Sequence, residues 1–353
     1  MQLDLFCELA SPPGTGATPA ARFDDLIEVA AAADRLGFGA LWLPEHHFLG
    51  DYSCASAPDM LLAAVARETR RLRLGFAILP LPIHEPIRIT ERLATLDALS
   101  GGRVEWGVGR GVTTTELEGL GVDPTASREI FLDNFADLQL LLETGGFNRG
   151  DRDYRLNPKP PTRLRQGWIA AVSPETFEIA ADLGLDVMTG PFKPWPMIEA
   201  DLARYRALRP SGRVSFTMAC YCGPDHAAAR ARAEAGIVWA YRRIFEVASG
   251  ILAKQVKGYE HYRKLGWLVP VLDRVMSLGV LETLGLASVG EPAHVAKRLV
   301  KLQAAGLDRV SLIVGGGDLS AAEQIASLEL IAREVMPALA DADRSGDTEM
   351  VPA

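Results

Sequence analysis

Residues 72–111 read LRLGFAILPLPIHEPIRITERLATLDALSGGRVEWGVGRG and contain one complete strand–helix–strand pattern. An apolar run at Leu72–Leu79 has the length of a buried strand, and an amphipathic stretch follows at Ile87–Leu99. A second apolar run, Val104–Val108, comes shortly after the helical stretch. Two strands joined in this way lie parallel in one sheet, with the helix covering it. The stretch therefore predicts a βαβ unit.

The same alternation extends to both ends of the chain. Amphipathic stretches of helical length separate the apolar runs, and a last one at Ala321–Leu339 follows the final run. Eight strand–helix units favour a closed (β/α)8 barrel, the TIM-barrel architecture, over an open doubly wound sheet. The predicted strands are Gln2–Cys7, Ala40–Leu43, Leu72–Leu79, Val104–Val108, Trp168–Val172, Val187–Thr189, Val214–Cys222 and Val310–Val314.

Two segments interrupt the alternation. Residues 144–165 are rich in Gly, Pro and Arg, which indicates an excursion before the fifth strand. Residues 223–288 predict a helical insertion after the seventh strand, either a lid over a ligand or extra helical packing. We expect one barrel domain over residues 1–340 and a flexible tail over 341–353. The insertion is dense in aromatic residues, namely Trp239, Tyr241, Phe245, Tyr259, Tyr262 and Trp267.

Composition narrows the classes of function. The 353 residues carry a formal charge of −8, and the charged residues form no Lys/Arg block. This balance argues against nucleic-acid binding and against a polybasic membrane anchor. No run of 18 apolar residues occurs, and the N-terminus lacks the basic start of a signal peptide. With only four cysteines, the sequence predicts a cytoplasmic protein without a disulfide framework.

A first candidate site follows the second predicted strand, in ALWLPEHHF at residues 40–48. Functional side chains of barrels gather at such strand ends. Neighbouring residues that leave a strand point in opposite directions, so His46 and His47 are poorly placed to chelate one metal ion. An acid–base histidine is the better functional interpretation, because imidazole titrates near neutral pH. A histidine that only pairs with Glu45 in a loop is the structural alternative.

Two further strand ends predict an anion site. The fourth strand opens into Gly107-Val-Gly-Arg-Gly111, where glycines allow close approach to a ligand and Arg110 offers a planar set of donors. The fifth strand leads to Ser173-Pro174, a typical helix start with unpaired backbone N–H groups. The run Gly315–Gly317 after the last strand is a rival phosphate site. Cys220 and Cys222 are interpreted as small buried apolar residues rather than ligands.

Taken in order, these features resemble the bacterial luciferase-like monooxygenases, a family of flavin-dependent (β/α)8 barrels. The resemblance runs nearly from end to end of the chain. It rests on LWLPEHHF at 41–48, the segment 75–111, AAVSPETFEIAADLGL at 170–185, VGEPAHVAKRLVKLQAAGLDRVSLIV at 289–314 and ELIAREVMPAL at 329–339.

The resemblance implies roles for individual residues. His46 matches the family's catalytic base, and the Ala77–Ile78 peptide matches a non-prolyl cis bond beneath the flavin ring. The phosphate contacts of the family match Arg110, Arg128, Ser173 and Thr176. Val172 stands where the luciferase subunit has Glu, so one side-chain acceptor of luciferase is missing here.

By the same resemblance, the chain uses reduced FMN and O2 to oxygenate a small organic substrate, such as an aldehyde or ketone, through a C4a-peroxyflavin. A separate NAD(P)H:flavin reductase and a homodimer are expected, with no metal. Hydride transfer from a deazaflavin (F420) in the same fold, or flavin binding without turnover, are the alternatives.

Overall fold

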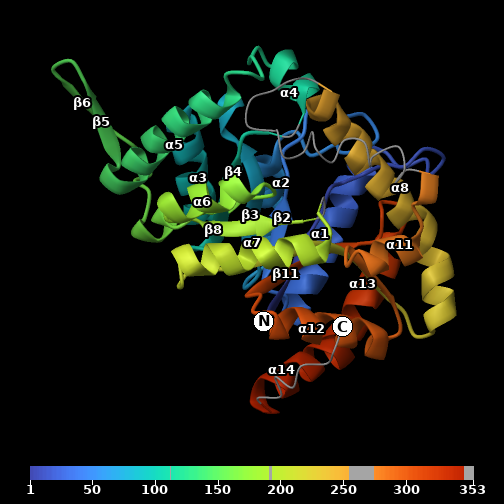
Figure 1. Cartoon of the computed structure of the whole chain (residues 1–353). Helices are drawn as coiled ribbons and strands as arrows, with labels where there is room; N and C mark the ends of the chain where they lie inside the picture. The colour runs from blue at the N-terminus through green and yellow to red at the C-terminus, as the bar shows by residue number, and fades with distance from the viewer. Residues whose placement is uncertain (112, 191–192, 254–273, 346–353) are drawn as a thin grey trace.

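The computed structural model describes residues 1–111, 113–190, 193–253 and 274–345. Eight parallel strands form a closed barrel in its centre, because β8 pairs with β9 and β11 pairs with β1 (Figure 1). The (β/α)8 barrel expected from the sequence is thereby confirmed. The barrel strands are β1 (Gln2–Phe6), β2 (Ala40–Leu43), β3 (Arg73–Pro80), β4 (Val104–Gly109), β7 (Trp168–Ala170), β8 (Asp186–Thr189), β9 (Val214–Cys222) and β11 (Arg309–Val314).

Each barrel strand leads to a helix on the outside of the barrel. Helix α1 illustrates the local signals: Thr18 Oγ1 accepts from Ala21 N at 3.2 Å at its start, and Gly37 ends it with a φ of +88°. The eight outer helices are α1 (Pro19–Leu36), α2 (Pro58–Glu68), α3 (Pro86–Ser100), α5 (Ser127–Thr144), α6 (Pro174–Asp182), α7 (Trp195–Leu208), α12 (Pro292–Ala304) and α13 (Ala321–Leu330). Short helical turns η1 (Leu81–Ile83), α4 (Thr114–Gly119) and η2 (Thr162–Arg165) lie in the connections.

The expected insertion follows β9, the seventh barrel strand. It contains α8 (His226–Ala253), α11 (Leu278–Thr283) and a short strand β10 (Ala287–Gly290), and α8 and α11 lie along one side of the barrel (Figure 1). Strand β10 was not expected from the sequence, because Ala287-Ser-Val-Gly290 contains no continuous apolar run; it pairs with the end of β9. The expected lid residues Tyr259, Tyr262 and Trp267 lie outside the described residues.

Residues 144–165 form the expected excursion as an antiparallel hairpin, β5 (Gly146–Arg149) and β6 (Arg152–Arg155), followed by η2. The hairpin projects away from the barrel (Figure 1). The fifth barrel strand is shorter than expected and ends at Ala170, so Val172 lies in the loop before α6.

The C-terminal segment corrects one expectation. After α13, a π-helical turn η4 (Ile331–Val335) leads into α14 (Met336–Ser345), so residues 341–345 are helical rather than part of a tail. An Asp341–Arg344 ion pair spans one turn of this helix, and Asp343 lies 3.6 Å from the N-terminal amine. These ion pairs stabilise the last turn of α14, and the polar sequence alone did not reveal them. Residues 346–353 lie outside the described part of the chain.

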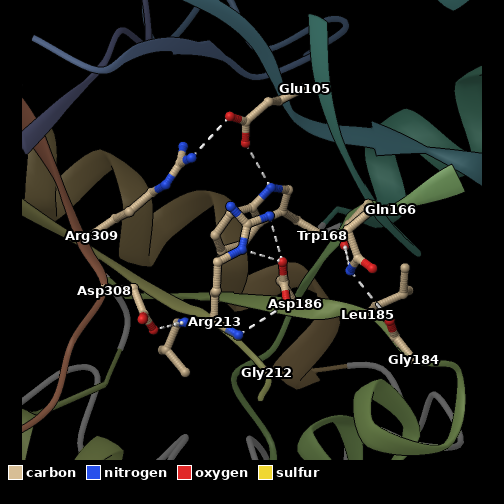
Figure 2. Close-up of polar contacts among 12 residues, drawn as sticks. Glu105, Gln166, Trp168, Gly184, Leu185, Asp186, Gly212, Arg213, Asp308 and Arg309 are labelled. Atoms are coloured by element: carbon tan, nitrogen blue, oxygen red, sulfur yellow. Dashed lines mark hydrogen bonds and ion pairs between the residues drawn. The ribbon is translucent and has the colours of Figure 1, made fainter. Parts of the chain in front are cut away.

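The two ends of the barrel interior differ. Side chains fill the end where the strands begin, which we call the floor, whereas the end where the strands finish, the mouth, is hollow. Near the strand starts, Glu105 of β4 accepts from Arg309 of β11 at 2.9 Å and from the indole of Trp168 at 2.9 Å (Figure 2). Asp186 accepts from Arg213 at 2.7 Å beside them (Figure 2). This polar network, buried except for the half-exposed Arg213, fills the barrel floor. No helix in the described ranges has both the length and the apolar character needed to cross a bilayer.

Candidate functional site

A cavity of about 210 Å³ opens at the C-terminal ends of the barrel strands. Its walls come from the last residues of β1, β3, β4, β7 and β8 and the loops that follow them, from the loop after β2, from Thr217 of β9 and from the first turns of α4, α5 and α6. Two α8 side chains, Ile244 and Val247, complete the wall. All of the site residues expected from the sequence line this one cavity: His46, Ala77, Ile78, Arg110, Arg128, Val172, Ser173 and Thr176. The fold therefore brings them together, while their roles remain predictions.

His46 is held by a carboxylate on each side of its ring. Its Nδ1 lies 3.0 Å from Glu116 Oε1, and its Nε2 lies 3.6 Å from Glu8 Oε2. Burial alone would lower the pKa of His46, but the hydrogen bond to Glu116 and the nearby carboxylates outweigh it and raise that pKa above 6.5. Because an ionised carboxylate can only accept a hydrogen bond, Nδ1 is the donor toward Glu116. Nε2 is therefore the ring nitrogen that gains or loses the titrating proton.

Glu116 is itself held in place by its own helix start. Burial would raise its pKa, but the hydrogen bond and charge of His46, then the donors His47 N and Thr113, lower it, so the carboxylate is ionised. His47 N donates to Glu116 Oε1 at 2.8 Å, and Thr113 Oγ1 donates to Oε2 at 2.8 Å. A carboxylate with this many donors keeps one orientation and so fixes the ring of His46.

Glu8 and Tyr52 complete the group around His46. Tyr52 donates its hydroxyl to Glu8 Oε1 at 3.0 Å, and the Tyr52 and His46 rings pack edge to face at 5.3 Å. Burial raises the pKa of Glu8 above its usual 4.5, although His46 and Tyr52 act in the opposite direction. Tyr52 is buried, and its pKa lies well above 10, chiefly for the same reason.

His47 turns away from the cavity, as expected from the alternation of side chains. Its Nε2 lies 3.0 Å from Glu45 Oε1, and His84 Nε2 lies 2.8 Å from the same oxygen. Burial would raise the pKa of Glu45, but the two imidazoles lower it to about 2. Glu45 thus organises a structural cluster on His47 and His84, whereas His46 belongs to the cavity.

The strands β3 and β4 pack closely at the cavity wall, where the Ile78 side chain of β3 lies against the glycines of β4. The Ala77–Ile78 peptide is cis, as the resemblance implied. A Cβ on Gly109 would lie 2.9 Å from Ile78 Cδ1, and one on Gly107 would lie 3.0 Å from the backbone oxygen of Phe76. The packing of β4 against the β3 backbone therefore accounts for Gly107, whereas a Cβ on Gly109 would meet the flexible end of the Ile78 side chain.

Two arginines face the cavity from β4 and from α5. Arg110 follows Gly109, and Arg128 stands in the first turn of α5. A cation at a helix N-terminus is unfavourably placed with respect to the helix dipole. No ion pair or hydrogen bond to Arg128 occurs among the residues that the structure describes, so an anion in the cavity would be its natural counter-charge.

The start of α6 adds backbone donors to the same wall. Ser173 is its N-cap residue and is buried, yet its hydroxyl lies 3.0 Å from Thr176 Oγ1 and does not cap the helix. In the first turn, Pro174 has no N–H and Thr176 N already donates to the Ser173 carbonyl at 2.9 Å, so the Glu175 N–H is the first-turn donor left to a ligand, at a helix end that favours anions. Lys193 Nζ donates to the Val172 carbonyl at 3.2 Å, which fixes the loop just before the helix. The carboxylate of Glu175 also lines this wall.

The rival phosphate site at Gly315–Gly317 has a structural explanation instead. A Cβ on Gly316 would lie 1.8 Å from the backbone oxygen of Gly236 in α8, so this loop and α8 pack backbone against backbone. Arg232 of α8 pairs with Asp318 at 3.1 Å next to this contact. The glycines hold the inserted helix against the barrel mouth.

Sequence reasoning did not identify Glu8, Tyr52 or Glu116. Glu8 lies two residues beyond the end of β1, so the rule that singled out His46 at a strand end also applies to it. Glu116 stands in Thr113-Thr-Thr-Glu116, the spacing of a capping box, which predicts a helix start there. Tyr52 has no comparable signal.

No group of three potential metal ligands occurs in the described ranges.

Comparison with known proteins gives one family over most of the chain. The model of the luciferase-like monooxygenases matches residues 1–309. Limonene 1,2-monooxygenase of Rhodococcus erythropolis is 28% identical over 333 residues, which cover 88% of this chain and 80% of that protein. 4-Hydroxyprotoasukamycin monooxygenase of Streptomyces nodosus subsp. asukaensis is 31% identical over 183 residues, about half of each chain (50% and 49%).

Solved structures share the same architecture. The oxygenating constituent of 3,6-diketocamphane monooxygenase from Pseudomonas putida, in complex with FMN, has a TM-score of 0.77 at 16% identity and covers 96% of this chain and 98% of its own. An F420-dependent secondary alcohol dehydrogenase has a TM-score of 0.67 at 18% identity, with 96% and 98% covered. At these identities the likeness establishes the fold alone.

Proposed function

Because this chain belongs to the luciferase-like monooxygenase family, we propose that it uses reduced FMN and O2 to oxygenate a small organic substrate. An aldehyde, a ketone or a related apolar compound is the expected class. The observation that carries the proposal is the shared cavity, which joins a carboxylate-held His46 to a cluster of anion-binding groups. Phosphate binding and proton transfer are thus available within one space.

The residues of the cavity wall fit a phosphate-bearing flavin. Arg110, Arg128 and the first turn of α6 would hold the phosphate, since guanidinium groups and helix N-termini both favour anions. Ser173 and Thr176 would add hydroxyl donors at the same place. The ring would lie toward Ala77, Ile78 and Val172, which line the apolar part of the cavity. When bound there, reduced flavin supplies the electrons for O2 activation.

His46 would move a proton at Nε2. Glu116 holds Nδ1 as a donor, so the lone pair of the neutral ring lies on Nε2, on the side of Glu8, and Nε2 can accept a proton from a reacting group. Ile244 and Val247 of α8 contribute apolar cover over the same space, which limits entry of water during the reaction.

Two partners belong to the proposal. The sequence carries no G-x-G-x-x-G fingerprint for a dinucleotide, so the reduced flavin would come from a separate NAD(P)H:flavin reductase. A homodimer is the expected assembly. Size measurement of the purified chain, and oxygen uptake with and without an added reductase, test the two points separately.

The direct test is titration of the purified chain with FMNH2, riboflavin and F420, followed by oxygen uptake and product analysis over aldehydes, ketones and alkanes. Binding of FMNH2 with O2-dependent gain of one oxygen atom supports the proposal. Hydride transfer to or from F420 without oxygen uptake would replace it with the deazaflavin alternative. Tight flavin binding with no product over the whole panel would indicate a binding protein. In the supported case, His46→Ala lowers turnover by about 10²–10⁴-fold and leaves flavin affinity nearly unchanged.

A further inference from the structure

A second cavity of about 80 Å³ lies beside the first, between the ends of β1 and β11 and the inner face of α8. Four residues line both cavities and so mark the place where the two spaces adjoin: Phe6, Glu8, Tyr52 and Ile244. We call this second cavity the side chamber. The shared residues include the same Tyr52 and Glu8 that surround His46.

The side chamber has an apolar wall. Most of its lining residues are aliphatic, aromatic or glycine, including Leu26, Val29, Ile237 and Ile313. Most of its polar side chains bond with each other or with the backbone, although the buried atoms Glu8 Oε2 and Arg22 Nε have no hydrogen-bond partner among the described residues. Tyr241 donates to the Leu286 carbonyl at 2.6 Å and Gln324 donates to the Leu319 carbonyl at 3.2 Å; Arg22 pairs with Asp25 at 3.2 Å. Such a space favours a hydrocarbon group over water or an ion.

The chamber is also rigidly bounded. Its outer wall is α8, which packs through Gly236 directly against Gly316, where no side chain fits. Arg243 of the same helix lies 2.7 Å from Asp51, near the loop that carries Tyr52. The space is therefore a built feature of the barrel mouth rather than a gap between loose elements.

We propose that the side chamber receives the hydrocarbon part of the substrate whose reacting group lies beside His46. By a measure in which one water takes about 10–15 Å³, the chamber has room for about five to eight non-hydrogen atoms. The inference rests on the proposed function, in which the flavin ring takes up much of the larger cavity. The substrate class is then an amphiphile with one small polar reacting end and an unbranched or compact apolar body.

Ligand length provides the first test. We would measure by calorimetry the binding of 2-alkanones from 2-butanone to 2-dodecanone, with and without FMN. Burial of each added methylene in the chamber should tighten binding about fourfold until the chamber is full, after which affinity should level off. Affinity that stays flat over the series, in a chain that binds FMN, would overturn the inference.

A matched pair of α8 variants provides the second test. Ala240 lines only the side chamber, whereas Ala235 is exposed on the same helix. Ala240→Leu should weaken the longer alkanones by about tenfold and leave 2-butanone nearly unchanged, because the added side chain takes up part of the space that a long chain needs. Ala235→Leu should leave the whole series unchanged. Equal effects of the two variants would locate the hydrocarbon elsewhere.

A third variant provides a check by enlarging the chamber instead of filling it. The flavin titration distinguishes failure of the chamber proposal from failure of the proposed flavin function. Ile237→Ala enlarges the chamber and should move the levelling point to longer alkanones; thermal unfolding and FMN binding check that each variant is folded. Length-dependent binding without FMN binding would retain the chamber and reject the flavin function. FMN-dependent oxygenation by a chain whose alkanone binding is unchanged in Ala240→Leu would retain the flavin function and reject the chamber.

Discussion

At the scale of single residues, the site depends on charges placed around one imidazole. His46 contacts Glu116 through Nδ1 and faces Glu8 through Nε2, and both carboxylates raise its pKa. Glu116 has the larger effect, because it adds a hydrogen bond to its charge. The direction of the His46 pKa is therefore set mainly by Glu116, which lines the same cavity.

Glu116→Gln should lower the pKa of His46. The amide oxygen can still accept from Nδ1, but the negative charge that stabilises imidazolium is lost, and burial then favours the neutral ring. Titration of the His46 ring signals by NMR measures the pKa directly, without any cofactor. Glu118→Gln, in the same short helix but outside the cavity wall, serves as the control. An unchanged His46 pKa in Glu116→Gln would mean that the contact does not set the proton affinity.

Arg110 offers a second residue-level prediction. Arg110→Ala should weaken FMN binding by about ten- to a hundredfold and riboflavin binding far less, because a charge-assisted bond is worth about 1.5–3 kcal/mol. Fluorescence titration with the two flavins measures the difference. Arg88→Ala, an exposed arginine paired with Glu91 on α3, is the matched control. Equal losses of affinity for both flavins would mean that Arg110 does not contact the phosphate.

Much of this site was predictable from sequence, because strand ends of a barrel share one face. His46, Arg110 and Ser173 each follow an apolar run, and this places them together without knowledge of distances. Glu116 and Tyr52 were not predictable in the same way. Their positions depend on how the loops after β4 and β2 fold back over the mouth, and that path is set by packing rather than by local pattern.

At the scale of elements, the inserted helix decides the shape of the barrel mouth. The sequence predicted a helical insertion at the right place, but its docking surface could not be predicted. Gly315–Gly317 resembled a phosphate loop, since glycine has the same local pattern in both roles. Only the position of Gly236 opposite Gly316 distinguishes a helix contact from a ligand contact.

Gly316→Ala tests this docking. The new Cβ would lie 1.8 Å from the Gly236 carbonyl oxygen, so the loop or α8 must shift. We expect a loss of about 1–3 kcal/mol in the free energy of unfolding, together with weaker binding of the longer alkanones. Chemical denaturation measures the first effect. The control is Gly279→Ala, at the start of α11, where the nearest atom lies 4.0 Å away. Equal stability of the two variants would show that the glycine contact does not hold α8.

At the scale of the whole molecule, buried charges join strands that are far apart in the sequence. Arg309 of β11 pairs with Asp4 of β1 at 3.3 Å and with Glu105 of β4 at 2.9 Å. Its guanidinium lies 5.1 Å from the Trp168 ring centroid, and that of Arg213 lies 4.7 Å from it. The sequence placed each of these residues in or next to an apolar strand but gave no indication that they meet, because their contacts exist only once the barrel has closed.

The floor network predicts a large and pH-dependent stability effect. Glu105→Gln keeps an acceptor for the Trp168 indole but leaves buried Arg309 with Asp4 as its remaining ion-pair partner. Removing one partner of a buried pair costs about 3–5 kcal/mol, whereas an exposed pair is worth at most about 1 kcal/mol. Urea unfolding should show the larger loss for Glu105→Gln and little change for Glu91→Gln, whose pair with Arg88 lies on the surface.

The sign of the pH dependence follows from the direction of the Glu105 pKa. Burial would raise it, but Arg309 and Arg73 lower it below 4.5 in the folded chain. A carboxyl with a lowered folded pKa contributes stability that is present above its unfolded pKa and is lost as the pH falls through the folded value. The difference in unfolding free energy between the wild-type chain and Glu105→Gln should therefore be full at pH 7 and shrink below about pH 4. A difference that is constant from pH 7 to pH 3 would mean that the network stabilises the barrel through shape and hydrogen bonds, not through charge.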